Sequence, residues 1–464
     1  MPKKNDIVRL AVTALTNEGS GVGKLPDGMV VFVPDTAAGD VIDCRIVKVT
    51  SHYCYGIAES LVTPSPQRCE DKCSVGKKCG GCCLRHIAYE HEAAEKERFV
   101  RDAFTRIGKL SPEFLPVIAA EAPDRYRNKA QFPVSQDENG RLYAGFFAKR
   151  SHRAIEAEDC LLLPELFIEV RDFIIGFCSE RGVSAYDERT GEGLLRHIFL
   201  RRGAHTGELM AALIVTSEES AELFRQLAKL TTERFPELRS FLLNVNPDRT
   251  NVILGEKTLT LFGRDMIFDT MCGKTVSVSL HSFYQINTVQ AERVYAQAAE
   301  FAGLTGGETL LDLYCGAGTI GLSMTERVKK LIGVEVIPQA IENAKENAAA
   351  NGISNAEFIC GDAGEAARLL FERGERPDVI IADPARKGCT RDTLEYMAKM
   401  APSRIVMISC NPATAARDCA ILGELGYKTE KCRAADFFPR TNHVECAVLL
   451  TRDRRTVSQV ICGE

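Results

Sequence analysis

TLLDLYCGAGTIGL, residues 309–322, is the stretch that decides the fold. It begins as an apolar run typical of a buried strand, continues into a turn with closely spaced glycines, and ends in a helix-forming segment. Glycines in such a turn let the backbone approach a ligand, and the amide groups of the following helix N-terminus face that ligand. The stretch therefore predicts a strand–turn–helix unit at the ligand-binding edge of an α/β sheet.

Four further apolar runs follow at regular intervals, each ending in a polar residue. They are KLIGVEVI, AEFICGD, DVIIADPAR and RIVMISCNP, and their polar ends are Glu335, Asp362, Asp383 and Cys410. Open α/β sheets bind ligands outside the carboxyl ends of their strands, so these side chains are expected to share one site. Glu335 follows Asp312 by 23 residues, a spacing that suits an acidic side chain binding the hydroxyls of a ribose. Asp362 is expected to lie near the adenine of the ligand.

The glycine turn alone does not identify the cofactor. Residues 316–321 match the dinucleotide-binding pattern only loosely. This motif alone therefore leaves an NAD-dependent dehydrogenase as an alternative function. The last two strands disfavour it. Cys410 lies in a turn before a helix, which favours a lowered thiol pKa and a nucleophile over a buried structural cysteine. Glu445 precedes the apolar run CAVLL; it is either a carboxylate beside Cys410 or a surface glutamate at a strand start.

Five motifs in a fixed order carry a resemblance to a known family. They are SFYQIN (282–287), DLYCGAG (312–318), DPARKG (383–388), SCNP (409–412) and HVE (443–445). Together they resemble the RNA uracil-C5 methyltransferases, which include 23S rRNA and tRNA 5-methyluridine enzymes. The resemblance implies an α/β fold: a Rossmann-like class I methyltransferase domain, an N-terminal β-barrel of the TRAM, OB-like kind, and a mixed α+β central domain.

The resemblance also implies roles for single residues. Cys410 would add to C6 of a uracil as the nucleophile, and Glu445 would remove the C5 proton as the base, a division of labour that makes C5 reactive toward a methyl sulfonium. The S-adenosylmethionine site and its border with the base would be lined by Gln285, Tyr314, Glu335, Asp362 and Asp383. An amino-group methyltransferase would carry an aromatic residue where the fourth strand here reads Asp-Pro-Ala-Arg.

Composition and patterning divide the chain into three predicted domains. Residues 1–62 contain short β-branched runs broken by Gly, Pro and Asp, typical of a small barrel, with six Lys or Arg and seven Asp or Glu. Residues 63–280 form the central domain, in which a helix over 91–108 is expected to pack on the catalytic domain. Residues 281–464 form the catalytic domain.

Eighteen cysteines are numerous for a chain without a predicted secretory signal, so metal or catalytic roles are expected for some of them. Five lie between Cys69 and Cys83, and the spacing of Cys73, Cys79 and Cys82 suits either a [4Fe–4S] cluster or a zinc ion. The family resemblance implies a [4Fe–4S] cluster on Cys73, Cys79, Cys82 and Cys160. Cys69 and Cys83 compete with Cys160 for the fourth position.

The net charge of −5 excludes a uniformly basic surface, so RNA contacts are expected from a local patch. Residues 125–153 hold seven Lys or Arg against two Asp or Glu, and aromatic residues are interleaved with them. Charge reversal at Arg125 or Arg127 is expected to weaken RNA binding. The patch is completed by Tyr126, Tyr143, Phe146 and Phe147, and extended by Arg196, Arg201 and Arg202.

The predicted function is a cytoplasmic 23S rRNA uridine-C5 methyltransferase. The alternatives are a tRNA enzyme with the same chemistry and a non-catalytic RNA-binding assembly factor. The expected partner is RNA, and DNA is not an expected partner. A membrane is not expected either, because no apolar run approaches the ~20 residues needed to span a bilayer. A monomer is the default expectation.

Overall fold

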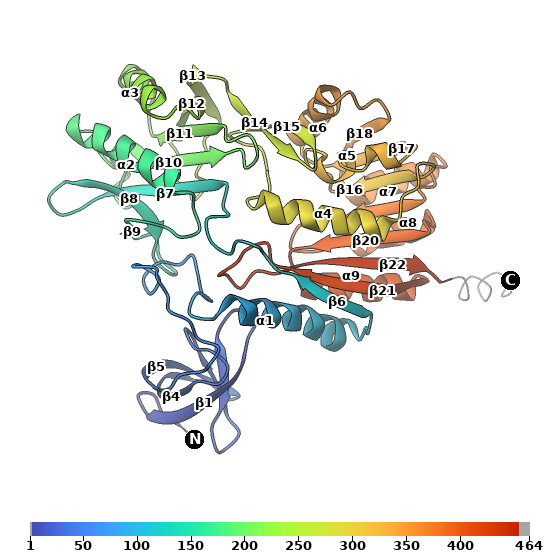
Figure 1. The fold of residues 1–464 in the computed structure, drawn as a ribbon, viewed down its shortest axis with the longest axis horizontal. Helices are drawn as coiled ribbons and strands as arrows, with labels where there is room; N and C mark the ends of the chain where they lie inside the picture. Colours follow the sequence, from blue (N-terminus) through green and yellow to red (C-terminus); the bar gives the residue numbers. More distant parts are fainter. Residues whose placement is uncertain (1, 454–464) are drawn as a thin grey trace.

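The computed structural model describes residues 2–453, which form three lobes. Figure 1 shows a β-barrel (blue) at the bottom, a sheet with two helices (green) at the upper left, and a larger sheet covered by helices (yellow to red) at the right. Among the described residues, no helix has the length and apolarity needed to cross a membrane. This arrangement confirms the predicted combination of barrel, mixed central domain and α/β domain.

The N-terminal lobe is a closed barrel with the strand order β1-β2-β3-β5-β4. Its strands alternate between inward and outward residues; in β4, for example, Ile42, Cys44 and Ile46 are fully buried while their neighbours are not. The inward residues form a hydrophobic core of their own. The strands are β1 (Ile7–Leu15), β2 (Gly21–Lys24), β3 (Val30–Val33), β4 (Val41–Val49) and β5 (Tyr53–Thr63).

The central lobe is a seven-stranded sheet in the order β13-β12-β11-β10-β7-β8-β9. One face packs against α2 and α3, and the other face shares a core with the catalytic lobe. Both faces are therefore buried, which explains why β11 is apolar throughout. The elements are β7 (Lys129–Gln136), β8 (Leu142–Phe147), β9 (Ala154–Glu156), α2 (Glu165–Glu180), β10 (Leu195–Arg202), β11 (Leu209–Val215), α3 (Ala221–Arg234), β12 (Leu238–Val245) and β13 (Lys257–Gly263).

The catalytic lobe contains an eight-stranded sheet in the order β18-β17-β16-β19-β20-β22-β21-β6. Strands β16 to β20 are mutually parallel, and β22 runs antiparallel to β20. The start of β22 therefore lies at the same edge as the ends of the parallel strands. The strands are β16 (Thr309–Leu313), β17 (Lys330–Glu335), β18 (Ala356–Cys360), β19 (Val379–Ala382), β20 (Arg404–Ser409), β21 (Tyr427–Ala435), β22 (Glu445–Arg452) and β6 (Glu113–Ile118).

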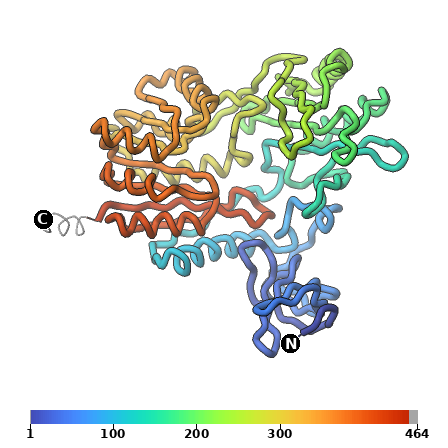
Figure 2. Tube along the Cα trace, turned by 180° about the vertical axis from the view of Figure 1, so that it is seen from behind, coloured from blue at the N-terminus to red at the C-terminus, as the bar shows by residue number. Residues whose placement is uncertain are grey.

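Strand β6 corrects the predicted domain boundary. Its residues 113–118 fall within the range 63–280 predicted for the central domain, yet β6 pairs in parallel with β21 and completes the catalytic sheet. Figure 2 shows the preceding helix and this strand running beside the C-terminal strands. The predicted helix over 91–108 is α1 (Tyr89–Asp102) followed by a π-helical turn, η1 (Ala103–Gly108), and both pack on the catalytic sheet.

Helices cover both faces of the catalytic sheet and enclose two hydrophobic cores. One face carries α1, η1, α7 (Ala363–Glu372), α8 (Arg391–Lys399) and α9 (Pro412–Glu424). The other carries the hairpin β14 (Met266–Met271) and β15 (Lys274–Ser279), with α4 (Thr288–Ala302), α5 (Thr319–Leu322), η2 (Thr325–Arg327) and α6 (Pro338–Ala350).

The glycine turn after β16 has the geometry that the sequence predicts. Gly316 and Gly318 have φ of 55° and 80°, and Tyr314 also adopts the left-handed region at 66°. Gly321 lies so close to the sheet that a Cβ atom there would approach Asp312 Oδ2 to 2.8 Å. Its amide donates to that same oxygen at 2.9 Å. The turn therefore brings α5 into direct contact with β16.

A buried lysine ties α1 to the segment that precedes Glu445, here called the 436–444 segment. Lys96 Nζ donates to Glu92 Oε1 at 2.8 Å, to Asp436 Oδ1 at 2.7 Å and to the Phe438 carbonyl at 3.1 Å. All three charged side chains are fully buried. Since a buried charge requires partners, the segment is fixed against α1.

Three other parts of the chain hold the same segment. The carbonyl of Arg440, at a left-handed φ of 71°, accepts from the amides of Cys83 and Leu84, which belong to the cysteine-rich segment. Tyr126 of the central lobe donates to the Pro439 carbonyl at 3.1 Å. Asn287, the N-cap of α4, donates to the Phe437 carbonyl at 3.0 Å. Contacts from α1, the cysteine-rich segment, the central lobe and α4 thus hold the segment that leads to Glu445.

We expect Lys96→Met to destabilise the protein by roughly 3–5 kcal/mol, because two buried carboxylates lose their partner. Urea unfolding followed by circular dichroism measures this change in the free energy of unfolding. The matched control is Lys345→Met, which removes a surface pair with Glu342 whose side chains are 52% and 59% exposed. Its expected cost is below about 1 kcal/mol. Equal effects of the two substitutions would contradict the assignment of Lys96.

Candidate active site and cysteine cavity

The register of β20 and β22 places the predicted nucleophile opposite the predicted base. The two strands pair antiparallel from Arg404↔Thr451 to Ser409↔Cys446. Continuing this register by one residue puts Cys410 opposite Glu445, and opposite residues in an antiparallel pair project to the same face. The side chain of Cys410 is partly exposed and Glu445 is buried. A thiol and a carboxylate therefore adjoin at the mouth of the sheet.

Asp383 adjoins this pair from the neighbouring strand. It follows β19 directly, and its amide donates to the Leu313 carbonyl at 3.3 Å. Burial raises the pKa of Asp383 to about 7. Burial, and then the charge of Asp383, raise the pKa of Glu445 to about 8. Without a ligand, a substantial fraction of each carboxyl group is therefore protonated near neutral pH.

The expectation of a lowered Cys410 pKa is wrong for the free protein. Burial raises the pKa of this thiol, and the charges of Glu445 and Asp383 raise it further, whereas the charge of Arg386 lowers it. The helix does not compensate, because Cys410 precedes the N-cap Asn411, whose side chain accepts from the Ala413 amide at 3.1 Å.

The residues predicted to bind S-adenosylmethionine lie along the same edge of the sheet. Glu335 Oε2 accepts from the Gly316 amide at 3.2 Å and Oε1 from the Ile337 amide at 2.9 Å, so the carboxylate is held beside the glycine turn. Tyr314 lies within that turn, half-buried. Asp362 is exposed and caps α7, accepting from the amides of Gly364 and Glu365. The carbonyl of Gln285 accepts from Asn128 Nδ2 at 2.7 Å.

Two buried residues that the sequence analysis did not assign also belong to this site. Asp312 Oδ1 has no hydrogen-bond partner among the described residues, and burial raises the pKa of this carboxyl to about 7. A carboxylate inside an apolar strand was a signal that could have identified it. Tyr295 of α4 is buried beside Gln285 and Thr319, and burial, with the charges of Asp383 and Glu445, raises its pKa. Its place on a helix gave no sequence signal.

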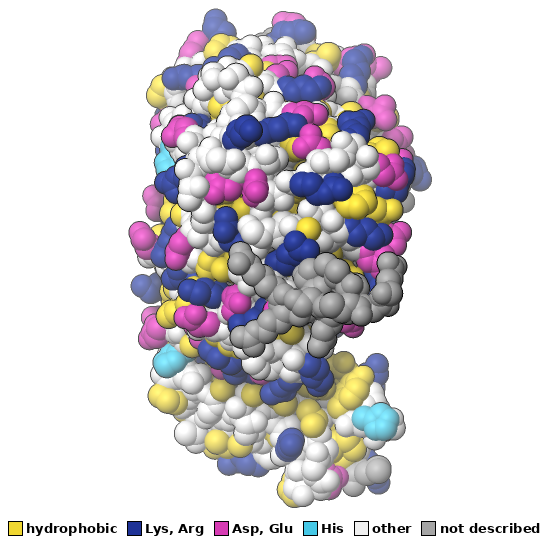
Figure 3. Space-filling view, turned by 90° about the vertical axis from the view of Figure 1, so that its right-hand side faces the viewer, with side chains coloured by type: hydrophobic (Ala, Val, Ile, Leu, Met, Phe, Trp, Pro, Cys, Tyr) yellow, Lys and Arg dark blue, Asp and Glu magenta, His cyan; other side chains and the backbone are white. Residues whose placement is uncertain are grey.

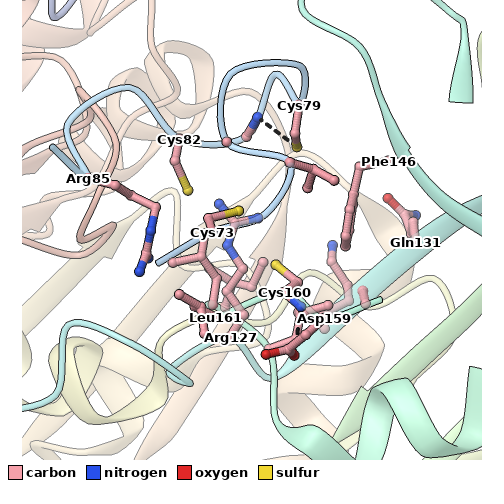
Figure 4. A pocket seen from close by; sticks show the side chains of 18 residues that line it. Cys73, Cys79, Cys82, Arg85, Arg127, Gln131, Phe146, Asp159, Cys160 and Leu161 are labelled. Carbon is pink, nitrogen blue, oxygen red and sulfur yellow. Dashed lines mark hydrogen bonds between the residues drawn. The ribbon is translucent and has the colours of Figure 1, made fainter. Parts of the chain in front are cut away.

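The cysteine-rich segment and a distant loop enclose one cavity of about 190 Å³. Figure 4 shows Cys73, Cys79 and Cys82 on one side of this cysteine cavity and Cys160 facing them. Cys69 and Cys83 do not line it: Cys69 Sγ contacts the Arg85 carbonyl, and Cys83 lies beside Gly19 of the barrel. The structure thus brings together the four predicted ligands and separates the two competitors from them.

The thiols of the cysteine cavity are suited to a cationic or electron-poor group. Burial raises the pKa of Cys79 and Cys160, and raises the pKa of Cys82 to about 12. Within residues 2–453, no three His, Cys, Asp or Glu side chains converge closely enough to bind one metal ion.

Most of the predicted basic patch faces inward. Arg125 binds both oxygens of Asp159 at 2.7 and 2.8 Å and the carbonyls of Cys160 and Leu163, so it clamps the loop that carries Cys160. Arg127 lines the cysteine cavity, where its charge lowers the pKa of Cys79, Cys82 and Cys160. Arg125 therefore has a structural role in holding this loop, and an RNA contact from its partly exposed side chain stays a prediction.

Other members of the patch are also occupied within the protein. Arg196 and Arg201 are buried and donate to backbone carbonyls. Tyr126 donates to the Pro439 carbonyl, and Phe146 packs against Phe132. The exposed cationic residues of the patch are Arg141, which pairs with Asp137 and Glu156, and Lys149, Arg150 and Arg153. In a sequence, arginines that pair within the protein and aromatic residues of the core cannot be distinguished from those of an RNA-binding surface.

We expect Glu445→Gln to increase the alkylation rate of Cys410 at about pH 9, above the Glu445 pKa of about 8. Removal of the carboxylate charge lowers the thiol pKa, which should increase the thiolate fraction by roughly three- to tenfold. Peptide mass spectrometry after iodoacetamide treatment measures the rate, with the exposed Cys360 in the same digest as the reference. An unchanged or slower reaction at Cys410 would contradict this arrangement.

Comparison with known proteins agrees with the geometry. The family described as tRNA (Uracil-5-)-methyltransferase matches residues 254–453, and the TRAM domain matches residues 3–58. An uncharacterized RNA methyltransferase of Halalkalibacterium halodurans is 41% identical over 96% of this chain and 97% of that protein. One from Clostridium tetani is 39% identical over 97% of both chains.

A solved structure covers nearly the whole chain. It is the tRNA (uracil-54, C5)-methyltransferase of Pyrococcus abyssi in complex with S-adenosyl-L-homocysteine, with a TM-score of 0.76 and 26% identity over 96% of this chain and 99% of that one. The relatives, the matched domains and this shared fold agree with the resemblance carried by the sequence motifs. The chain therefore belongs to the family of S-adenosylmethionine-dependent RNA (uracil-5-)-methyltransferases.

Proposed function

We propose that this enzyme converts a uridine of 23S rRNA to 5-methyluridine through a covalent adduct on Cys410. The observation that carries the mechanism is the β20–β22 register, which sets a thiol opposite a buried carboxylate. We further propose that it acts in the cytoplasm as a monomer. Gln285, Tyr314, Glu335, Asp362 and Asp383 would line the site of S-adenosylmethionine and its border with the base.

In the proposed reaction, the Cys410 thiolate bonds to C6 of a uracil that has left its stack. The electrons of the C5–C6 double bond move toward the O4 carbonyl, and C5 then takes the methyl group, which releases S-adenosyl-L-homocysteine. Glu445 removes the remaining proton from C5. The C6–sulfur bond breaks, the double bond reforms and the thiolate returns. Asp383 would form a hydrogen bond with the uracil edge.

The electrostatics of the free site are consistent with these roles. A cationic sulfonium beside Asp383 and Glu445 would favour their ionised forms and lower both pKa values. Glu445 would then be ready to accept a proton once the methyl donor is bound. The buried Tyr295 hydroxyl, beside Gln285 and Thr319, would help to keep this wall of the site in place.

We propose that Cys73, Cys79, Cys82 and Cys160 hold a [4Fe–4S] cluster. Four thiolates and the adjacent Arg127 suit an anionic cluster. When bound, it would supply a rigid link between the cysteine-rich segment and the Cys160 loop. The methyl transfer needs no electron from it.

The second candidate substrate is tRNA. The tRNA enzyme of Pyrococcus abyssi matches 96% of this chain, which includes the barrel, so a barrel alone does not favour rRNA. The cysteine cavity and the barrel together support the rRNA proposal through the family resemblance. The two substrates need a direct comparison.

Incubation with S-adenosylmethionine carrying a labelled methyl group should label naked 23S rRNA and not tRNA, as mapped by nuclease digestion and mass spectrometry. Label in tRNA alone would assign the second candidate.

RNA containing 5-fluorouridine should form a stable covalent adduct, because Glu445 cannot remove fluorine from C5. Cys410→Ala should abolish the adduct and Cys360→Ala should leave it intact. An adduct with the Cys410→Ala protein would exclude the proposed nucleophile.

Protein purified without oxygen should contain iron and sulfide in equal amounts, close to four of each per chain as a [4Fe–4S] cluster requires. Cys160→Ala should lower the iron content sharply, whereas Cys69→Ala should retain it. Arg125→Ala should also lower it, because the clamp on the Cys160 loop is lost. Zinc in place of iron, or a larger loss in Cys69→Ala than in Cys160→Ala, would exclude this assignment.

A further inference from the structure

Three aromatic side chains form a cluster on the outside of the barrel, here called the barrel aromatic cluster. It consists of Phe32 of β3 and Tyr53 and Tyr55 of β5, with ring centroids 5.5–5.9 Å apart. In the parallel pairing of β3 with β5, Val31 and Cys54 point into the barrel core and Phe32 pairs with Tyr55. The rings are therefore outward-facing and contribute nothing to that core.

The cluster is open to solvent, because Tyr55 is 41% exposed. A soluble protein has no structural need for three aromatic rings at adjoining outward positions, and such groups commonly mark a binding surface. Tyrosine and phenylalanine rings present flat faces, on which the bases of an unpaired nucleic acid strand stack.

Positive charge adjoins the cluster from two lobes. Lys48 of the barrel lies with Nζ 5.9 Å from the centre of the Tyr55 ring. The charges that act on the Tyr55 hydroxyl include those of Glu18 and of Arg150 from the central lobe. Arg150 belongs to a groove also lined by Gln131, Phe147, Lys149 and His152. The exposed part of the basic segment thus contains a cation whose charge reaches the barrel aromatic cluster.

The loop between β1 and β2 of the barrel contacts the 436–444 segment, which leads to Glu445. Asn442 Nδ2 donates to the Asn17 carbonyl at 3.2 Å, and Asn442 precedes Glu445 by three residues. Asn17 adjoins Glu18, whose charge reaches Tyr55. On the face in Figure 3, by contrast, Lys and Arg side chains alternate with Asp and Glu over the catalytic lobe.

We propose that the barrel aromatic cluster is a stacking site for unpaired bases of the substrate RNA, next to the strand that delivers the target uridine. Lys48 and Arg150 would hold its phosphates. The inference rests on the proposed function, and it adds the requirement that the RNA be single-stranded beside the target. Bases inside a duplex would not reach the rings, because their faces are already stacked.

The test compares binding of a short unstructured RNA with binding of a duplex of the same sequence, by fluorescence anisotropy. Tyr55→Ala and Phe32→Ala should each weaken binding of the single strand by roughly 5- to 100-fold, the effect of losing one stacked base, and should leave duplex binding unchanged. The matched control is Leu61→Ala on the same strand, where Leu61 is 43% exposed and six residues, or roughly 20 Å, from Tyr55. It should bind both RNAs as the wild type does.

The salt dependence separates stacking from charge. Arg150→Ala should reduce the slope of log Kd against log salt by about 0.7, the value for one phosphate of a single strand. Tyr55→Ala should leave that slope unchanged. The proposal is overturned if both aromatic variants bind the single strand like the wild type, if Leu61→Ala loses as much, or if the duplex is affected equally.

Covalent trapping distinguishes this inference from the proposed function. If the wild type traps 5-fluorouridine RNA while Tyr55→Ala and Phe32→Ala bind the single strand normally, only the stacking site is wrong. If the wild type forms no adduct with saturating RNA, the proposed function is wrong. Unchanged S-adenosyl-L-homocysteine affinity and thermal unfolding of the variants establish that each is folded.

Discussion

The ammonium group of Lys96, buried between the carboxylates of Glu92 and Asp436, fixes where the catalytic segment can lie. Buried ion pairs contribute little net stability, because desolvation offsets their attraction, but an unpaired buried charge is costly. Positions of the 436–444 segment that leave Lys96 without Asp436 are therefore excluded. The left-handed Arg440, whose carbonyl accepts two amides from the cysteine-rich segment, lies at the centre of the same segment. Contacts outside the parallel strands thus determine where the 436–444 segment, and with it Glu445, lies.

The catalytic edge concentrates acidic groups in a poorly solvated space. Asp312, Asp383 and Glu445 come from three strands, and burial is the largest cause of the raised pKa in each. Such a site favours a cationic ligand, since a positive charge stabilises the ionised carboxylates that burial disfavours. The methyl donor of this family is a cation and its demethylated product is neutral. The same electrostatics would therefore help to release the product.

Local sequence pattern predicted the catalytic lobe well, because its strands are continuous apolar runs ending in polar residues. Glu335, Asp383 and Cys410 all lie at the predicted strand ends. The membership of β6 in the catalytic sheet could not be predicted, since its only partner in the described sheet, β21, lies some 300 residues later.

Side-chain environments were harder to predict than strands. A run rich in arginine suggests an exposed patch. In the structure, however, Arg125 binds the Asp159 carboxylate and Arg127 lines the cysteine cavity. The Cys410 pKa depends on burial and on carboxylates from two other strands, neither of which a local motif contains. Tyr295 gave no signal because a buried aromatic on a helix is usual in any core.

The pairing of β6 with β21 has a consequence for synthesis of the chain. Residues 113–118 leave the ribosome long before residues 427–435, and at ~5–20 residues per second the delay is roughly 15–60 s. During that time β6 has no strand to pair with, and α1 carries Glu92 and Lys96 without Asp436. An unpaired strand and an incomplete ion pair of this kind are natural targets for a chaperone. The nascent chain thus keeps an unpaired β6 until its last strands, β21 and β22, leave the ribosome.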